Sequence, residues 1–323
     1  MPSRKTGGTG LVIALVAISA VAAQDNPFTM HAPPPVVGRW DVTVGAAGEQ
    51  YPSWFEVWQS GYRTLVGTYV GQFGSARPLG KVEYDDGRVQ FAVPPQWEQR
   101  TDDQVLEGTL HGDVIRGETT NDSGDRIEWI AHRAPSLDRS EPVQWGEPIE
   151  LFNGHDLAGW KPRFAGARNG WAAKDGVLAN VQPGNDLLTE QQFTDFKLQT
   201  ELRYPQGSNS GIYLRGRYEV QIEDDYGQEP DSHRIGGVYG FLTPCVNAAR
   251  QANEWQTLEI TLVGRAITVV LNGERILDRQ AIPGITGGAL DSDEGEPGPI
   301  LLQGDHGPIE FRRMTLTPGV SGP

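Results

Sequence analysis

The chain has 323 residues, a length that fits two domains of ordinary size. It carries 42 Asp and Glu against 27 Lys and Arg, a net charge of −15, so we expect no nucleic-acid partner, because such proteins normally present a basic patch or stripe. The 41 Gly and 23 Pro follow no period and stand beside 9 Trp, 9 Tyr and 10 Phe, which favours a turn-rich β protein over a disordered chain.

The N-terminus has the pattern of a secretory signal peptide. Arg4 and Lys5 precede an apolar run over 11–22, and small residues end it at Ala23. The run is shorter than the roughly 20 residues that a membrane-spanning helix needs. We therefore expect residues 1–23 to be removed, no transmembrane segment afterwards, and an exported protein that is periplasmic, extracellular or held at the cell surface. The single cysteine, Cys245, allows no internal disulfide.

Residues 36–133 alternate between short strand patterns and turn sequences, which predicts a small antiparallel β-barrel or sandwich. The predicted strands are 40–44, 54–59, 64–70, 81–84, 89–93, 105–110, 114–119 and 126–132. No pair of titratable groups stands out here, so the pattern assigns this domain no chemistry. We predict that its tryptophans are core residues and not sugar platforms; they are Trp40, Trp54, Trp58, Trp97 and Trp129.

Residues 134–148 are polar and rich in proline, as expected of a linker. The domain that follows, 149–318, is again patterned as strands and predicts a two-sheet sandwich. Its predicted strands are 197–204, 210–215, 218–223, 255–263, 266–271, 274–278 and 309–317. Asn272-Gly273 indicates a tight hairpin, and only 188–193 and 246–253 have room for a turn or two of helix.

Several segments of this second domain resemble the 3-keto-disaccharide hydrolase domain family. They are LFNGHDLAGW at 151–160, NSGIYLRG at 209–216, YEVQI at 218–222, ILLQGDHG at 300–307 and FRR at 311–313. The resemblance covers 149–318 and leaves the first domain outside. It implies a concanavalin A-like jelly roll, export from the cytoplasm, and cleavage of 3-keto-glycosides or 3-keto-disaccharides.

Alternate residues of a strand face opposite sides, so the predicted hairpin gathers a polar face. A three-residue loop after Arg215 would set Arg215 opposite Glu219 and Tyr213 opposite Gln221. A two-residue loop would mix polar and apolar side chains, so we predict the first register. The face so formed is either a functional site or an ordinary solvated surface with an Arg–Glu cross-strand pair.

The segment Gln303-Gly-Asp-His306-Gly-Pro is a glycine-rich loop between two apolar strands, and glycines let a backbone approach a ligand closely. His306 is its one side chain that titrates near neutrality. The alternative is that the segment is only a structural turn. His233 is a weaker second candidate.

A ketone at C3 of a sugar acidifies the hydrogen on C2, so a base can remove it and expel the group at C1. Water then adds, for net hydrolysis. The reaction needs a base, an acid at the leaving oxygen and a donor to the enolate. Glu219 and His306 are the candidate base and acid, in either order. Arg215 and Gln303 are candidates for polarising the keto oxygen, and Tyr213, Gln221 and Asp224 for binding the substrate.

The sequence requires no cofactor, although a divalent metal stays open as the electrophile. Glu219, Asp224 and His306 are its candidate ligands. The acidic stretch 291–296 misses the spacing of a calcium loop and predicts a solvated loop.

Three alternatives remain. Glu219 and Glu223 resemble the strand of laminarinase-like retaining glycosidases, with Gln221 in place of the central Asp. A regular strand separates such residues by about 13 Å, however, whereas retention needs carboxyls about 5–5.5 Å apart. The second is a lectin-like carbohydrate-binding module, and the third is a structural cell-surface protein.

Overall fold

The computed structural model describes residues 32–139 and 141–320, so the predicted signal peptide at 1–23 lies outside the described residues. Every regular element in that part is a strand, and the all-β fold class is confirmed. The described residues hold no helix with the length and apolarity to cross a membrane. The two segments with room for helical turns, 188–193 and 246–253, form none; the first begins in a short strand instead.

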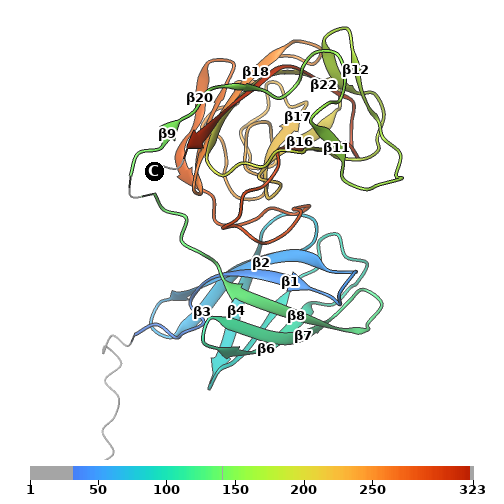
Figure 1. Ribbon diagram of the computed structural model, residues 1–323. Helices are drawn as coiled ribbons and strands as arrows, with labels where there is room; N and C mark the ends of the chain where they lie inside the picture. Colours follow the sequence, from blue (N-terminus) through green and yellow to red (C-terminus); the bar gives the residue numbers. More distant parts are fainter. Residues whose placement is uncertain (1–31, 140, 321–323) are drawn as a thin grey trace, which may run out of the picture. The chain divides into compact units, whose positions relative to one another are not determined.

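The first eight strands close into an antiparallel barrel (Figure 1). Neighbours in sequence pair in order, and β1 closes the ring on β8. All eight strands predicted from the alternating pattern are present. Their bounds are β1 Gly38–Val44, β2 Tyr51–Ser60, β3 Thr64–Val70, β4 Arg77–Asp85, β5 Arg88–Val93, β6 Gln104–His111, β7 Val114–Thr120 and β8 Arg126–Arg133.

The barrel tryptophans divide between core and surface. Those that are buried, as predicted, are Trp40, Trp54 and Trp129. The prediction is wrong for Trp58 and Trp97, which are 41% and 68% exposed. Trp58 lies at the end of β2, where the strand leaves the core, and Trp97 lies on the loop between β5 and β6.

Residues from Gln144 onward build the predicted two-sheet sandwich. The larger sheet runs in the order β12-β13-β22-β15-β18-β19-β20, with β9 and β10 also paired to β22. Its bounds are β9 Gln144–Trp145, β10 Ile149–Glu150, β12 Trp171–Lys174, β13 Val177–Asn180, β15 Phe196–Arg203, β18 Gln256–Val263, β19 Ala266–Leu271, β20 Glu274–Ala281 and β22 Ile309–Val320. The smaller sheet, in the order β11-β14-β21-β16-β17, has the bounds β11 Trp160–Pro162, β14 Leu187–Thr189, β16 Asn209–Leu214, β17 Tyr218–Glu223 and β21 Leu301–Leu302.

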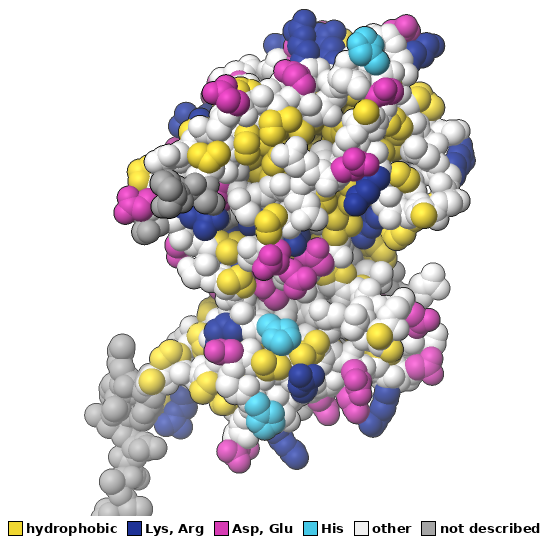
Figure 2. Space-filling model, viewed as in Figure 1, with side chains coloured by type: hydrophobic (Ala, Val, Ile, Leu, Met, Phe, Trp, Pro, Cys, Tyr) yellow, Lys and Arg dark blue, Asp and Glu magenta, His cyan; other side chains and the backbone are white. Residues whose placement is uncertain are grey.

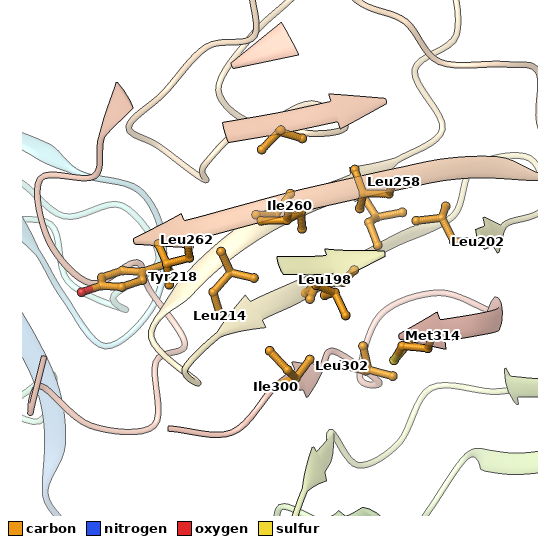
Figure 3. Close-up of a cluster of buried hydrophobic side chains, with 14 of the residues drawn as sticks. Leu198, Leu202, Leu214, Tyr218, Leu258, Ile260, Leu262, Ile300, Leu302 and Met314 are labelled. Carbon is orange, nitrogen blue, oxygen red and sulfur yellow. The ribbon is translucent and has the colours of Figure 1, made fainter. Parts of the chain in front are cut away.

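Alternation along these strands fills the space between the two sheets with apolar side chains (Figure 3). Leu198 and Ile260 of the larger sheet meet Leu214 and Leu302 of the smaller one in a single buried cluster. Burial of apolar area stabilises by roughly 25 cal/mol per Å². The predicted hairpin at Asn272-Gly273 is present. Both residues adopt the positive φ angles that such a tight turn requires, 52° and 83°.

The barrel and the sandwich lie in one compact unit that starts at Pro33. Trp54 and Val70 of the barrel belong to the same buried cluster as the sandwich core, and the Trp54 ring meets Phe241 edge to face at 5.7 Å. The chain between the two is itself anchored, since Arg139 pairs with Asp195 at 2.8 Å. The first domain is therefore packed against the second through apolar contacts.

Candidate functional site

The hairpin of β16 and β17 differs in register from the prediction. Tyr213 pairs with Glu219, and Gly211 pairs with Gln221. The loop has the expected three residues but starts at Arg215, one position early, because Arg215 itself adopts a positive φ of 54°. The predicted register is wrong, yet alternate residues still share a face, so Tyr213, Glu219 and Gln221 stay together.

Arg215 leaves that face. Its guanidinium is buried and donates to the Tyr218 hydroxyl at 2.9 Å, to Gly264 O at 3.1 Å and to Glu294 O at 3.2 Å. These contacts join the hairpin loop to two other loops of the sandwich. The structure thus places Arg215 away from the polar face, where it cannot polarise a substrate bound over Glu219.

Glu219 is the central group of the site and is only 4% exposed. Its Oε2 lies 3.0 Å from the Tyr213 hydroxyl. Gln221, with its amide oriented so that both its atoms are satisfied, donates to Glu219 Oε1 at 3.3 Å. Burial raises the pKa of Glu219 to about 8, against the opposing effects of the Tyr213 hydrogen bond and the charge of His306. A carboxyl with such a pKa is suited to proton transfer near neutrality.

Gly211 makes room for this carboxyl. A Cβ at position 211 would lie 2.3 Å from Glu219 Oε1, closer than any real contact. Its φ is not positive, so the requirement for glycine here is one of space and not of backbone conformation. The NSGIY segment therefore has a physical reason for its glycine, which is to let the Glu219 side chain lie across the neighbouring strand.

Glu219 opens into a cavity of about 360 Å³, a volume within the range of small-molecule sites. The cavity is lined by Phe73, Gly74, Trp97, Arg163, Asp186, Asn209, Tyr213, Glu219, Gln221, Tyr239, Gly287, Gly288, Gln303, Asp305 and His306. Five of the seven predicted site residues are in this set. Arg215 and Asp224 are not; Asp224 accepts a hydrogen bond from Gly207 N at 2.9 Å.

His306 enters the cavity from the glycine-rich loop and is half-exposed. Its Nδ1 lies 2.5 Å from Asp305 Oδ1. This hydrogen bond has a larger effect on the pKa of His306 than burial does, and it raises that pKa above its ordinary value. The charges of Glu219 and Asp186 raise it further. His306 therefore keeps its proton to a higher pH than a free imidazole.

Gln303 precedes that loop and offers an unused polar atom. Its backbone N–H donates to Gly211 O at 2.9 Å, which fixes the residue beside the β16–β17 hairpin. Its Oε1 is buried and has no hydrogen-bond partner among the described residues. A buried polar atom without a partner costs free energy, so the amide is poised to bind a polar ligand in the cavity.

The sequence analysis missed several lining residues. Arg163 brings a positive charge to the cavity, and its Nη1 donates to Asp186 Oδ2 and to Gly288 O, both at 3.1 Å. Tyr239 also lines the cavity, as do the barrel residues Phe73 and Trp97. The high exposure of Trp97 is the one property that could have identified it, and exposure cannot be read from a sequence.

His233, the second histidine candidate, lies outside the cavity lining. Its Nδ1 is 2.7 Å from Asp231 Oδ1 and its Nε2 is 2.5 Å from Ser75 Oγ. The order of groups matches a catalytic triad, but none of the three lines a described cavity, so the contact serves to join barrel and sandwich. The described residues contain no group of three or more His, Cys, Asp or Glu arranged to hold a metal ion.

Charged side chains of both signs are mixed on one face of the described residues (Figure 2). On the face drawn in Figure 2, Lys and Arg side chains are scattered among Asp and Glu and form no continuous basic patch.

Comparisons with solved structures gave several matches. A structure of a candidate glycosyl hydrolase from Parabacteroides distasonis is 28% identical, with a TM-score of 0.44, and the match covers 55% of this chain and 93% of that one. A second candidate glycosyl hydrolase from the same organism is 19% identical, with a TM-score of 0.46, over 54% and 94% of the two chains. The carbohydrate-binding module CBM66 from Bacillus subtilis is 12% identical, with a TM-score of 0.33, over 51% and 96%. No match was found among curated proteins.

The family comparison matches the sandwich and the whole hairpin that carries Glu219. A model for the 3-keto-alpha-glucoside-1,2-lyase-like domain matches residues 147–317. This range includes every predicted site residue and agrees with the resemblance noted from the sequence motifs. It spans more than half of the 323 residues, and the chain therefore belongs to the family of 3-keto-alpha-glucoside-1,2-lyase-like domains.

Proposed function

We propose that this carbohydrate-related protein is an enzyme that cleaves the glycosidic bond of 3-keto-glycosides by elimination followed by hydration. The observation that carries the proposal is the buried carboxyl of Glu219, whose pKa is about 8, in a cavity that also holds His306. Two titratable groups with perturbed pKa values in one cavity are typical of an acid–base site. Membership of the 3-keto-alpha-glucoside-1,2-lyase-like family supports the choice of 3-keto-glycosides as substrates.

In the proposed elimination, Glu219 is the base. Its ionised carboxylate takes the proton from C2, and the electron pair of the C2–H bond forms an enolate with the oxygen on C3. The burial that raises its pKa also makes the carboxylate a stronger base than an exposed one. Tyr213 and Gln221 hold both carboxyl oxygens in place, which positions the base before the substrate arrives.

His306 is the proposed acid. The enolate collapses, the C3 carbonyl reforms, a C1=C2 double bond appears, and the C1–O bond breaks as His306 protonates the leaving oxygen. Water then adds across the double bond. His306 takes a proton from the water as its oxygen bonds to C1, and protonated Glu219 returns a proton to C2. Both residues end as they began, and the sum of the steps is hydrolysis.

The developing enolate needs a donor. Because Arg215 lies elsewhere, we assign this role to the Gln303 amide, which can turn its Nε2 toward the keto oxygen. Arg163 supplies positive charge at the cavity wall. A divalent metal bound by Glu219 and His306 is the competing electrophile, and chelation separates the two.

The decisive experiment compares a 3-keto-glucoside with its unoxidised parent, with and without EDTA. We expect cleavage of the keto compound alone and no effect of the chelator. Cleavage of the parent would favour the retaining glycosidase instead, although its second carboxyl, Glu223, does not line this cavity. Binding of unoxidised sugars without turnover would favour the lectin-like module.

Variants test the residues. Glu219→Gln should lower kcat at least about 100-fold, because general-base catalysis is worth about 100- to 10,000-fold. Deuteration of C2 should slow the wild type, because the base breaks the C2–H bond. Glu223→Gln, on the same strand, is the matched control and should retain activity. If Glu219→Gln and His306→Ala both keep full turnover, the assignment of the site is wrong.

We also propose export, on the pattern of Arg4, Lys5 and the apolar run at 11–22. N-terminal sequencing of the protein from the periplasmic or culture fraction should find a start near Gln24. A chain that begins at Met1 and stays in the cytoplasm would contradict this.

A further inference from the structure

The catalytic cavity shares a wall with a second cavity at one end of the barrel. This barrel-mouth cavity has a volume of about 460 Å³. Phe73 and Trp97 line both cavities. Phe73 lies between β3 and β4, and Trp97 lies between β5 and β6, so two separate barrel loops converge on the boundary. A ligand that fills the catalytic cavity and extends past these two side chains enters the barrel mouth.

Both aromatic side chains are unusually exposed. Trp97 is 68% and Phe73 is 58% exposed, although the burial of an aromatic side chain would contribute substantially to stability. Exposed apolar groups gathered at one place mark a binding surface more often than chance exposure does. The barrel therefore presents an aromatic platform at the catalytic cavity and not at some unrelated part of its surface.

The loop that carries Trp97 is held in place. Buried Arg77 pairs with Glu98 at 2.8 Å and donates to Pro94 O at 2.8 Å. Glu98 Oε2 in turn accepts the backbone N–H groups of Gln96 at 2.8 Å and of Trp97 at 3.1 Å. An exposed tryptophan on an anchored loop is preorganised, so a ligand that stacks on it does not have to order the loop.

Glycines bring this platform against the sandwich. A Cβ on Gly74 would lie 2.4 Å from Trp97 Cδ1, and a Cβ on Gly287 would lie 2.4 Å from Gly74 O. Gly288 N donates to Gln72 O at 2.8 Å. Gly287 O also accepts from the Tyr213 hydroxyl at 2.9 Å, the same hydroxyl that contacts Glu219. The platform and the proposed base are thus joined by a short chain of direct contacts.

The lining of the barrel mouth indicates the chemistry of its ligand. It consists of Tyr51, Tyr69, Gly71, Gln72, Phe73, Trp97, Glu98, Gln99, Gln104, Asn121, Asp122, Ser123 and Ile127. No Lys, Arg or His is among these described residues, so the cavity does not suit an anion. Amide, hydroxyl and carboxyl groups beside aromatic rings suit an uncharged ring with many hydroxyls, whose C–H face stacks on the aromatic ring while its hydroxyls form hydrogen bonds.

We propose that Trp97, together with Phe73 and the barrel-mouth cavity, binds the leaving group of the substrate, and that this group is a second, unoxidised sugar ring. The inference rests on the proposed function, because it places the keto-sugar ring over Glu219 and the leaving sugar on the barrel side. It gives the first domain a role: the barrel makes the enzyme selective for disaccharides over glycosides with small leaving groups.

The test compares Trp97→Ala with wild type on two substrates, a 3-keto-disaccharide and methyl 3-keto-glucoside. We expect kcat/KM for the disaccharide to fall about tenfold or more, as for the loss of an aromatic anchor in a binding site. The loss for the methyl glycoside, which lacks the second ring, should be clearly smaller. Trp58→Ala is the matched control, since Trp58 is an exposed tryptophan of the same barrel that lines neither cavity.

A binding measurement keeps the inference independent of turnover. Sucrose, trehalose, maltose and cellobiose are titrated into wild type, Trp97→Ala and Trp58→Ala, with circular dichroism to verify folding. Binding that is lost only in Trp97→Ala supports the barrel site even if no keto substrate is cleaved, in which case the proposed function alone fails. Turnover with an unchanged ratio between the two substrates in Trp97→Ala overturns the barrel site and leaves the proposed function standing. If the protein shows neither turnover nor disaccharide binding, both the barrel site and the proposed function are overturned.

Discussion

Replacing Glu219 with glutamine should change how the stability of the protein depends on pH. The carboxyl has a pKa of about 8 in the folded protein, against 4.5 when it is free of its surroundings. The folded state therefore holds this proton more tightly than the unfolded state, and ionisation of Glu219 opposes folding. The stability that protonated Glu219 contributes is present below about pH 4.5 and is lost as the pH rises to about 8. Glutamine cannot ionise, so the variant escapes that loss.

The size of the effect follows from the two pKa values. At 1.36 kcal/mol per unit, the advantage of Glu219→Gln over wild type should grow by about 3 kcal/mol between about pH 5 and pH 7, and by about 4 kcal/mol between about pH 5 and pH 9. The change in this difference with pH reports chiefly on Glu219, with a smaller contribution from His306, whose pKa the Glu219 charge helps to raise. Glutamine also keeps the shape of the side chain and an oxygen that can accept from Tyr213.

Urea unfolding followed by tryptophan fluorescence would measure this difference at the three pH values. Glu274→Gln is the matched control, since Glu274 is exposed on β20, and its difference from wild type should stay flat. An advantage of Glu219→Gln that changes by less than about 1 kcal/mol over the whole range would refute the argument, because the carboxyl would then ionise as easily in the folded protein as in the unfolded chain.

Two further predictions concern the neighbours of this carboxyl. Gly211→Ala should destabilise the protein by about 1–3 kcal/mol and reduce turnover, because the new Cβ would lie 2.3 Å from Glu219 Oε1 and displace it. Gly80→Ala is the control and should do neither, because a Cβ there meets nothing within 4 Å. Equal urea midpoints for the two variants would contradict this prediction. Asp305→Asn should shift the titration of the His306 imidazole to lower pH, since the Asp305 carboxylate is the largest influence that raises its pKa. An NMR titration of the His306 ring would contradict this if it moved to higher pH or did not move.

The strands of the barrel could be predicted because they depend on local patterns. Apolar residues alternate along β2, where Phe55 and Val57 face the barrel core, and turn residues separate each strand from the next. A period of two needs no knowledge of distant contacts. The short strands β9 to β14 and β21 were missed, because segments of two to four residues are too short to show a period.

The site could be predicted only in part. Tyr213, Glu219 and Gln221 were grouped correctly because they alternate on adjacent strands, whatever the register. Arg215 was misplaced because the start of the loop depends on the buried partners that hold its guanidinium, and these come from loops near 264 and 294. Local sequence does not reveal such partners.

The sequence by itself therefore determined the all-β class, the polar face of one hairpin and the family, because each rests on residues that are close together in the chain. Tertiary structure alone decided the register of that hairpin, the burial that raises the pKa of Glu219, and the meeting of Arg163, Asp186 and Trp97 around one cavity. The physical reason is that burial and electrostatic environment come from side chains far apart in sequence. Trp97 shows this most plainly, because it was predicted to be a core residue and only the fold leaves it exposed at the cavity that holds Glu219.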